Sequence, residues 1–391
     1  MRFLILFYAL WWPLPTIGFT TRSRPNTLVT TTQLHATTVT PSFSQSLLDF
    51  TLQTPLWKYV MVPQARSKMI QTAESNGILW KKAHEWIRSE FASELDKELD
   101  TSNVPSYYRK PFHAYQEGNL SWDAAFEVEL ASCAVGARNV PLEGKNGENA
   151  FRGMFEVALE QAGATFPSNG VIVDLGCSTG MSTRRLAQLW PEASQVIGID
   201  MSPYFVEVGK KLLQLEPKSS DEGGPWVSSI QGDDRISLRV GNIQQDTGLS
   251  NVDVVQLQFV AHELPPSIAK QVVDEAFRMM KPGGQLWMCE MDFEAPAYAA
   301  QRANPLLFCL IRATEPYLDE YADSAAELRQ YIASKFSITK VVAATGRHYA
   351  LVATKGEDRD ATGVLEDLRF NPDGTYRKED THLKVWENKQ E

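Results

Sequence analysis

Apolar residues follow two alternating periods through the middle of the chain. Short apolar runs of strand character are separated by stretches in which apolar residues recur every three to four positions, as in amphipathic helices. This alternation predicts a doubly wound, mostly parallel α/β sheet. The final two runs are split only by Thr345-Gly346-Arg347, a connection that can join only antiparallel neighbours. We therefore predict seven strands with an antiparallel final hairpin, at residues 171–175, 195–199, 236–240, 252–258, 285–291, 337–344 and 348–355.

Helical patterns connect these strands and also precede them. The run Lys281-Pro282-Gly283-Gly284 predicts a helix stop and a turn before the fifth strand. An irregular segment rich in aromatic residues, at 103–119, interrupts the helical text that precedes the sheet. Helices are predicted in 43–99 and at 122–135, 150–162, 181–189, 204–215, 268–280 and 304–335. We expect an N-terminal helical region at 43–165, a sheet domain at 166–355 and a polar tail at 356–391.

The first 42 residues have the composition of targeting segments. An apolar stretch at 3–12, too short to cross a bilayer, follows Arg2 and predicts a signal peptide at 1–18. Residues 19–42 are rich in Ser and Thr, contain arginine and lack acids, as transit peptides do. The two segments together resemble the bipartite plastid presequence of diatoms and related algae, with Phe19 at the cleavage position. We expect plastid localisation, and a plain secretory signal is the alternative.

A glycine turn after the first strand carries the clearest chemical signal. The sequence VIVDLGCSTGMSTR places Asp174 at the end of an apolar strand, followed by Gly176 and Gly180 and then by a helical pattern. A strand, a glycine turn and a helix form nucleotide sites in α/β sheets. The spacing is not the G-x-G-x-x-G of dinucleotide sites, which argues against an NAD-dependent oxidoreductase. A carboxylate beside the turn would repel a pyrophosphate and attract the ammonium and sulfonium charges of S-adenosylmethionine.

The ordered acids and glycines resemble the motifs of class I S-adenosylmethionine-dependent methyltransferases, in the small-molecule branch that includes plastid and cyanobacterial methyltransferase-like proteins. The resemblance covers roughly residues 171–355. It implies that Asp174 faces the donor's amino group, that Asp200 accepts the ribose hydroxyls and that Met201 packs on the adenine. Asn242 stands where many members carry Asp and can still accept from the adenine amino group. The implied donor-binding residues are Asp174, Gly176, Ser178, Gly180, Asp200, Met201, Asn242, Ile243 and Gln258.

The methyl acceptor has candidate residues in two segments. His262, just beyond the fourth predicted strand, is of a residue type that titrates in the range suited to general-base work. The segment before the sheet, where family members keep a helical lid, supplies His113 as a second candidate base. The same segment offers Tyr115, Asn119 and Trp122 as acceptor-contacting residues. Both histidines could instead be structural, one capping a loop and one buried among aromatic residues.

Charge and missing motifs narrow the acceptor class. A net charge of −10 argues against a nucleic-acid partner, which usually requires a basic stripe. After the fourth strand the chain reads QFVAHEL, with neither the [DN]-P-P-[YFW] motif of amino-methylating nucleic-acid enzymes nor a Pro-Cys nucleophile. We find no metal-ligand cluster and no transmembrane segment in the mature chain, and leave peripheral membrane contact open. These observations favour a small, hydrophobic acceptor. The alternative is a non-catalytic methyltransferase-like binding or assembly factor.

Overall fold

The computed structural model describes residues 62–113, 115–215, 233–303, 314–356 and 363–380. The predicted signal and transit segments lie outside the described residues. The strands are β1 (Val171–Leu175), β2 (Gln195–Asp200), β3 (Ile236–Val240), β4 (Val252–Gln258), β5 (Met280–Met291), β6 (Ile338–Ala343), β7 (His348–Thr354) and β8 (Val364–Asp367). The α-helices are α3 (Val62–Ser75), α4 (Trp80–Glu90), α5 (Trp122–Asn139), α6 (Gly147–Gln161), α7 (Met181–Leu189), α8 (Pro203–Leu212), α9 (Pro266–Met279), α10 (Pro296–Arg302) and α12 (Leu318–Lys335). Short 3₁₀ helices are η2 (Ser106–Arg109), η3 (Pro141–Asn146) and η5 (Ala261–Glu263).

The sheet has the predicted doubly wound topology. Its strand order is β3-β2-β1-β4-β5-β7-β6-β8, and β1 pairs in parallel with both β2 and β4. The β6–β7 hairpin is antiparallel, as the short connection required. From β1 the sheet grows toward β2 and β3 on one side and, from β4 onward, toward β5 on the other. The order of strands therefore reverses between β1 and β4, and the carboxyl ends of these strands form the crevice in which α/β proteins bind ligands.

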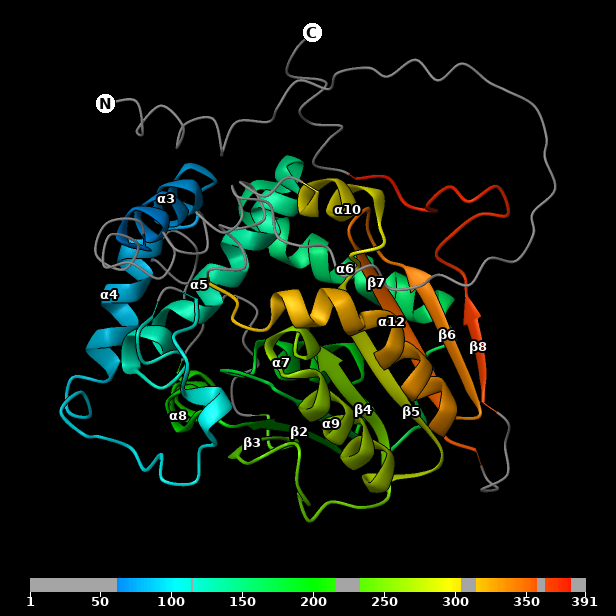
Figure 1. The fold of residues 1–391 in the computed structure, drawn as a ribbon. Helices are drawn as coiled ribbons and strands as arrows, with labels where there is room; N and C mark the ends of the chain where they lie inside the picture. The colour runs from blue at the N-terminus through cyan, green and yellow to red at the C-terminus, as the bar shows by residue number, and fades with distance from the viewer. Residues whose placement is uncertain (1–61, 114, 216–232, 304–313, 357–362, 381–391) are drawn as a thin grey trace, which may run out of the picture.

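The predicted strand count was one too low. β8 pairs in parallel with β6 at the sheet edge, and its residues belong to the segment that we expected to be a polar tail (Figure 1). The strand reads Val364-Leu365-Glu366-Asp367, a run too short and too charged to show a strand period. Pairing with the edge of β6 therefore determines the strand conformation of β8, whereas the side-chain pattern of β8 does not predict it.

Two element boundaries also differ from the prediction. β5 begins at Met280 and includes the Lys-Pro-Gly-Gly run that we predicted as a turn. Its register with β4 shifts between Val252 and Val254, and Gly283 has a φ of +77° there. A bulge thus absorbs the glycines within the strand. The last long helix, α12, begins at Leu318, and residues 304–313 of its predicted span lie outside the described part of the chain.

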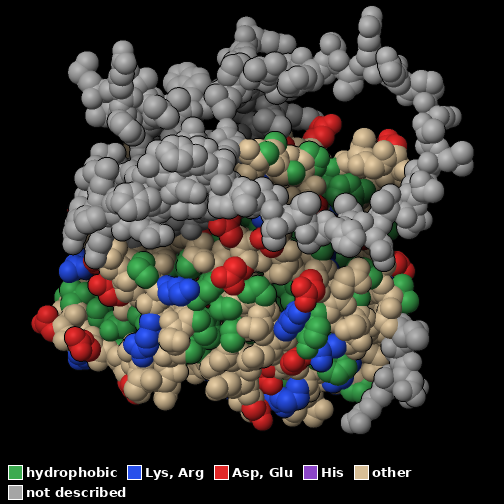
Figure 2. All heavy atoms as spheres, in the orientation of Figure 1, with side chains coloured by type: hydrophobic (Ala, Val, Ile, Leu, Met, Phe, Trp, Pro, Cys, Tyr) green, Lys and Arg blue, Asp and Glu red, His purple; other side chains and the backbone are tan. Residues whose placement is uncertain are grey.

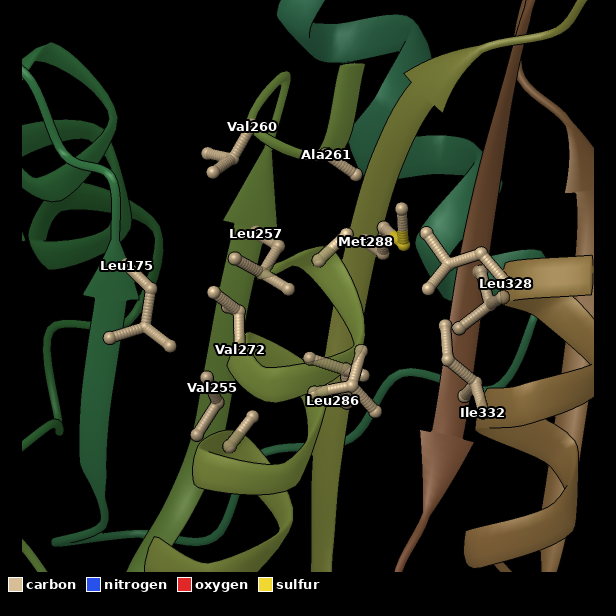
Figure 3. Close-up of a cluster of buried hydrophobic side chains, with 14 of the residues drawn as sticks. Leu175, Val255, Leu257, Val260, Ala261, Val272, Leu286, Met288, Leu328 and Ile332 are labelled. Carbon is tan, nitrogen blue, oxygen red and sulfur yellow. The ribbon is translucent and has the colours of Figure 1, made fainter. Parts of the chain in front are cut away.

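Apolar side chains cover both faces of the sheet. Helices α9 and α12 pack on one face, where side chains from β1, β4 and β5 meet those of the two helices (Figure 3). Phe151 and Phe155 of α6 and Leu186 of α7 cover the opposite face, against Ile172, Val254 and Trp287. Because the central strands are buried on both sides, they read as continuous apolar runs, as parallel strands do.

The N-terminal helices form a layer beside the sheet. Helices α3, α4 and α5 pack together, and α5 also contacts α6 and α8 (Figure 1). Aromatic rings fill this contact, with Trp122 stacked on Phe126 and edge-on to Tyr204 of α8. Within the described residues, no helix has the length and apolarity that a membrane crossing needs. The helical layer brings residues from α5 and from the preceding loop to the carboxyl edge of β1 and β2.

Candidate functional site

The turn between β1 and α7 is a narrow loop folded onto the end of β2. Gly176 and Gly180 have φ angles of +74° and +84°, and the amides of Gly176 and Cys177 both donate to the carbonyl oxygen of Ile199. A Cβ atom on Gly176 would lie 2.6 Å from a methyl carbon of Val260. Glycine is therefore required at this position both by backbone conformation and by space. We call residues 176–180 the donor turn.

Replacing Gly176 with alanine is expected to lower the free energy of unfolding by about 2–5 kcal/mol, the sum of a left-handed alanine and overpacking against Val260. Gly163 is a matched control, because its φ is +92° and no atom lies within 4 Å of the place that a Cβ atom would take. The Gly163→Ala variant should lose only about 1–2 kcal/mol, from the backbone alone. Urea unfolding of both variants measures the difference, and equal losses would show that the Val260 contact is unimportant.

Asp174, at the end of β1, is buried beside the donor turn. Its carboxylate accepts hydrogen bonds from Ser182 Oγ at 2.6 Å and Thr183 Oγ1 at 2.7 Å, and from Gln256 Nε2 at 3.3 Å. Burial raises the pKa of Asp174, and these three donors oppose the rise. The acid thus ties the first turn of α7 to β1 and β4. It is a buried carboxyl group behind the donor turn.

Asp200, at the end of β2, faces the same turn from the other side. Its carboxylate accepts from the amides of Ser178 and Ser202, each at 2.8 Å, and from the Tyr108 hydroxyl at 3.3 Å. Burial raises the pKa of Asp200, against the opposing effect of the two amides. Tyr108 comes from η2 in the loop before α5, so the N-terminal region reaches the group that the resemblance assigns to the ribose.

Further features of this edge fit S-adenosylmethionine. The Ser178 hydroxyl oxygen is buried with no hydrogen-bond partner, although such groups are nearly always paired in folded proteins. A ligand hydroxyl or amino group would satisfy it. Met201 and Ile243 are buried next to the ends of β2 and β3, and their contact with the adenine stays a prediction. Asn242 accepts from the Gln244 amide through Oδ1 at 3.1 Å, and therefore also shapes the turn after β3.

A buried ion pair lies beyond the end of β4. The His262 ring nitrogen Nδ1 is 2.9 Å from the Glu290 carboxylate of β5, and both side chains are almost fully buried. Burial disfavours the imidazolium, but Glu290 outweighs this effect and raises the pKa of His262 to about 10. Phe259, just before this segment, has a φ of +58°, a conformation that L-residues seldom adopt. With a pKa of about 10, the His262 imidazole is cationic at neutral pH, and the predicted general-base role does not fit it.

Glu263, the neighbour of His262, has the acid–base properties that we expected of the histidine. Its carboxylate lies 4.0 Å from His113 Nε2, and His113 in turn lies 2.9 Å from Glu315. Burial raises the pKa of Glu263 to about 7, against the lowering effect of His113 and His262. Both predicted histidines thus belong to one acid–imidazole cluster, which we define as His113, His262, Glu263, Glu290 and Glu315.

Of the other predicted acceptor residues, Asn119 lies beside Asp200, and Tyr115 and Trp122 lie in the helical layer. The Asn119 carbonyl accepts from Ser202 Oγ at 2.6 Å, which places it beside Asp200. Tyr115 instead donates to Glu127 within the helical layer, and Trp122 packs on Phe126 there. Both side chains thus fill the contact between helices, and their contact with an acceptor stays a prediction. Aromatic residues in a helical region more often build a core than a ligand site.

Sequence reasoning missed several residues of the site. Tyr108 was hidden in the aromatic segment at 103–119, and Glu290 looked like one of many scattered acids. Gln258, predicted beneath the donor's methionine portion, accepts from Arg152 Nη1 of α6 at 2.8 Å. The available signal for Glu290 was its position at the end of β5, next to the strand that precedes His262.

Comparisons with known proteins find similarity to a methyltransferase domain. Residues 173–288 match a family model described as a methyltransferase domain. Arsenite methyltransferase of Mus musculus is 32% identical over 204 residues, 51% of this chain and 50% of the relative. Carboxy-S-adenosyl-L-methionine synthase of Hydrogenovibrio crunogenus is 26% identical over 122 residues, 31% of this chain and 43% of that protein. The chain thus spans half or less of the length of these curated relatives.

The solved structures that match are more distant in sequence. An O-methyltransferase family protein from Burkholderia thailandensis is 15% identical, covers 70% of each chain and has a TM-score of 0.39. The S-adenosylmethionine-dependent methyltransferase SibL, in its apo form, is 19% identical, with 54% of this chain and 57% of SibL covered and a TM-score of 0.39. Residues 173–288 are thus similar to a methyltransferase domain. The doubly wound strand order of the sheet around them is the one expected from the resemblance to class I S-adenosylmethionine-dependent methyltransferases.

Proposed function

We propose that this protein is an enzyme that transfers a methyl group from S-adenosylmethionine to a small, predominantly apolar molecule. The observation that carries the proposal is that Tyr108 links Asp200 to the acid–imidazole cluster. Tyr108 donates to Asp200, and both Asp200 and Glu263 act electrostatically on this hydroxyl and raise its pKa, after burial itself. A donor held at Asp200 would therefore lie beside the groups that could handle the acceptor's proton.

The chemistry can be assigned to the chain's own residues. S-adenosylmethionine supplies a methyl group already activated by its positive sulfur, so the protein needs mainly to align the reactants and exclude water. Glu263 accepts the acceptor's proton, because a pKa of about 7 suits a general base near neutral pH. His262, kept cationic by Glu290, stabilises the negative charge that develops on the acceptor. The loop that carries Tyr108 and His113 closes the site.

The small apolar acceptor is supported by the residues around the cluster. Tyr317 donates to the Tyr107 carbonyl at 2.9 Å, and the Lys110 ammonium lies 4.3 Å above the Tyr317 ring. The rings of Phe112, Phe259 and Tyr321 pack against the two histidines of the acid–imidazole cluster. On the visible face of the molecule, basic and acidic side chains are interspersed (Figure 2). This mixed face gives no support to a nucleic-acid substrate, which would call for a basic stripe.

Replacing Asp200 with alanine is expected to weaken S-adenosylmethionine binding about 10–150-fold, from the loss of hydrogen bonds to a charged acceptor worth about 1.5–3 kcal/mol. Isothermal titration of the wild type and the variant measures the effect. Asp246→Ala is a suitable control, because its carboxylate is exposed and pairs with Arg278 at 2.8 Å and with the Gly248 amide. If the wild type binds no S-adenosylmethionine, the proposed function fails.

The acceptor itself can be identified by comparing metabolites with and without the gene, in search of pairs that differ by one methyl group. Transfer of labelled methyl from S-adenosylmethionine to a metabolite extract gives the matching assay for the purified protein. A non-catalytic assembly factor would give stoichiometric partners in pull-down experiments and no labelled product. Labelled product that disappears in the Asp200→Ala variant would exclude that alternative.

We further propose that the protein acts in a plastid. The support is the sequence of residues 1–42, with an apolar segment followed by Phe19 and an acid-free Ser/Thr-rich segment. A fluorescent protein fused after residue 42 should enter the plastid of an alga with this type of presequence. Phe19→Ala should leave the fusion outside the plastid. Secretion of the unmodified fusion would support the plain secretory signal instead.

A further inference from the structure

Helix α5 carries a buried acid that touches the donor turn from outside the matched domain. Glu129 is 3% exposed, and its Oε1 accepts from Thr179 Oγ1 and from Arg184 Nη2, each at 2.7 Å. The other oxygen, Oε2, is buried with no hydrogen-bond partner. A buried carboxylate oxygen without a donor is unfavourable by about 1–3 kcal/mol or more. A ligand that brings a cationic donor to this place would remove that cost.

Helix α6 carries a largely buried guanidinium, 12% exposed, near the start of α7. Arg152 donates to Glu148 through Nε at 2.5 Å and to Gln258 through Nη1 at 2.8 Å. Its Nη2 makes only long contacts, of 3.5 Å to Ser132 and 3.4 Å to the sulfur of Met181. Met181 is the first residue of α7, and the guanidinium acts electrostatically on Asp174. The least occupied nitrogen of Arg152 therefore lies at the start of α7.

Space for a ligand adjoins this arginine. A cavity of about 570 Å³ opens between α6 and α7, and Arg152, Ser182, Gln256 and Gln258 line its polar end. Ser182 and Gln256 are two of the residues that donate to Asp174. The cavity therefore reaches from the back of the donor turn to the guanidinium. The amide groups at the start of α7 also favour an anion at this place.

We propose that Glu129 and Arg152 bind the amino-acid end of S-adenosylmethionine. Glu129 Oε2 accepts from the donor's ammonium group, and Arg152 Nη2 donates to its carboxylate. The inference rests on the proposed function, since it assumes that this molecule is the ligand. It assigns part of the donor site to helices that precede the matched residues 173–288. The two charges have opposite signs and lie on adjacent helices, as recognition of a zwitterion requires.

Three ligands separate the two contacts by isothermal titration. S-adenosylmethionine has both charged groups, its decarboxylated form keeps the ammonium alone, and 5′-methylthioadenosine has neither. Glu129→Gln should weaken the first two about 10–150-fold and leave the third within about twofold. Arg152→Met should weaken only S-adenosylmethionine, by a similar factor. Glu127→Gln is the matched control, because Glu127 is a second 3% exposed acid of α5 that instead pairs with Arg66 and Tyr115, and it should change no ratio between ligands.

Each alternative result overturns the inference. Equal weakening of all three ligands by Glu129→Gln would show that the acid only supports the turn through Thr179 and Arg184. Unchanged S-adenosylmethionine binding in either variant would remove that residue from the site. The ratio of two affinities does not depend on the folded fraction, so partial unfolding of a variant cannot imitate the expected pattern. If the wild type bound 5′-methylthioadenosine but showed no preference for S-adenosylmethionine, this inference would fail while the adenosine site stood. Binding of none of the three would overturn the proposed function as well.

Discussion

Glu263→Gln is expected to lower the rate of methyl transfer about 10²–10⁴-fold, the usual effect of removing a general base. The carboxylate lies in the acid–imidazole cluster, with a pKa of about 7 and His113 at 4.0 Å. A glutamine has nearly the same shape and can still donate a hydrogen bond, but it cannot take a proton. The measurement is transfer of labelled methyl from S-adenosylmethionine to a metabolite extract, at saturating donor.

The pH dependence gives this prediction a second readout. Because the carboxylate must be ionised to act, the wild-type rate should rise about tenfold per pH unit below 7 and level off above it. The rise should be absent from the residual activity of Glu263→Gln. Donor affinity should be unchanged in the variant, which shows that the fold and the donor turn are intact. A wild-type rate that falls as pH rises through 7 would instead indicate an acid at this step.

Arg369→Met is expected to lower the free energy of unfolding by about 3–5 kcal/mol, the usual cost of breaking a buried ion pair. Arg369 is 2% exposed and donates to Asp292 Oδ1 at 2.7 Å and to Asp367 at 2.6 Å. Asp292 is fully buried and, among the described residues, would keep the Tyr376 hydroxyl, at 2.8 Å, as its one side-chain donor. Methionine fills much of the volume but leaves the carboxylate without its counter-charge. Urea unfolding measures the loss.

Two further variants test the reason for that loss. Arg377→Met, at an exposed arginine that donates to the Phe370 carbonyl, should change stability by less than about 0.5 kcal/mol. Adding Asp292→Asn to Arg369→Met should recover part of the stability, because the uncompensated charge is then removed. A loss below about 1 kcal/mol in Arg369→Met would mean that the segment after β8 contributes little to the fold.

The positions of the candidate donor-site residues were largely predictable because these residues follow strands. Asp174 and Asp200 end β1 and β2, and the carboxyl ends of neighbouring parallel strands meet at one edge of the sheet. The spacing of Gly176 and Gly180 similarly specified the tight turn between β1 and α7. The acceptor side was less predictable. His262 and His113 lie together in the acid–imidazole cluster, whereas Tyr115 and Trp122, assigned to the acceptor from residue type alone, contact neighbouring helices.

The sequence by itself determined the order of strands and helices, the antiparallel hairpin and the donor turn, because these depend on local periodicity and short connections. Tertiary structure decided which group can accept a proton. Glu290 raises the pKa of His262 to about 10, and burial raises the pKa of Glu263 to about 7, although His262 and Glu263 are adjacent in the sequence. It also decided that Val364–Asp367 forms a strand and that Glu129 meets Thr179, fifty residues away. A pKa and an edge pairing both depend on neighbours that only the folded chain supplies.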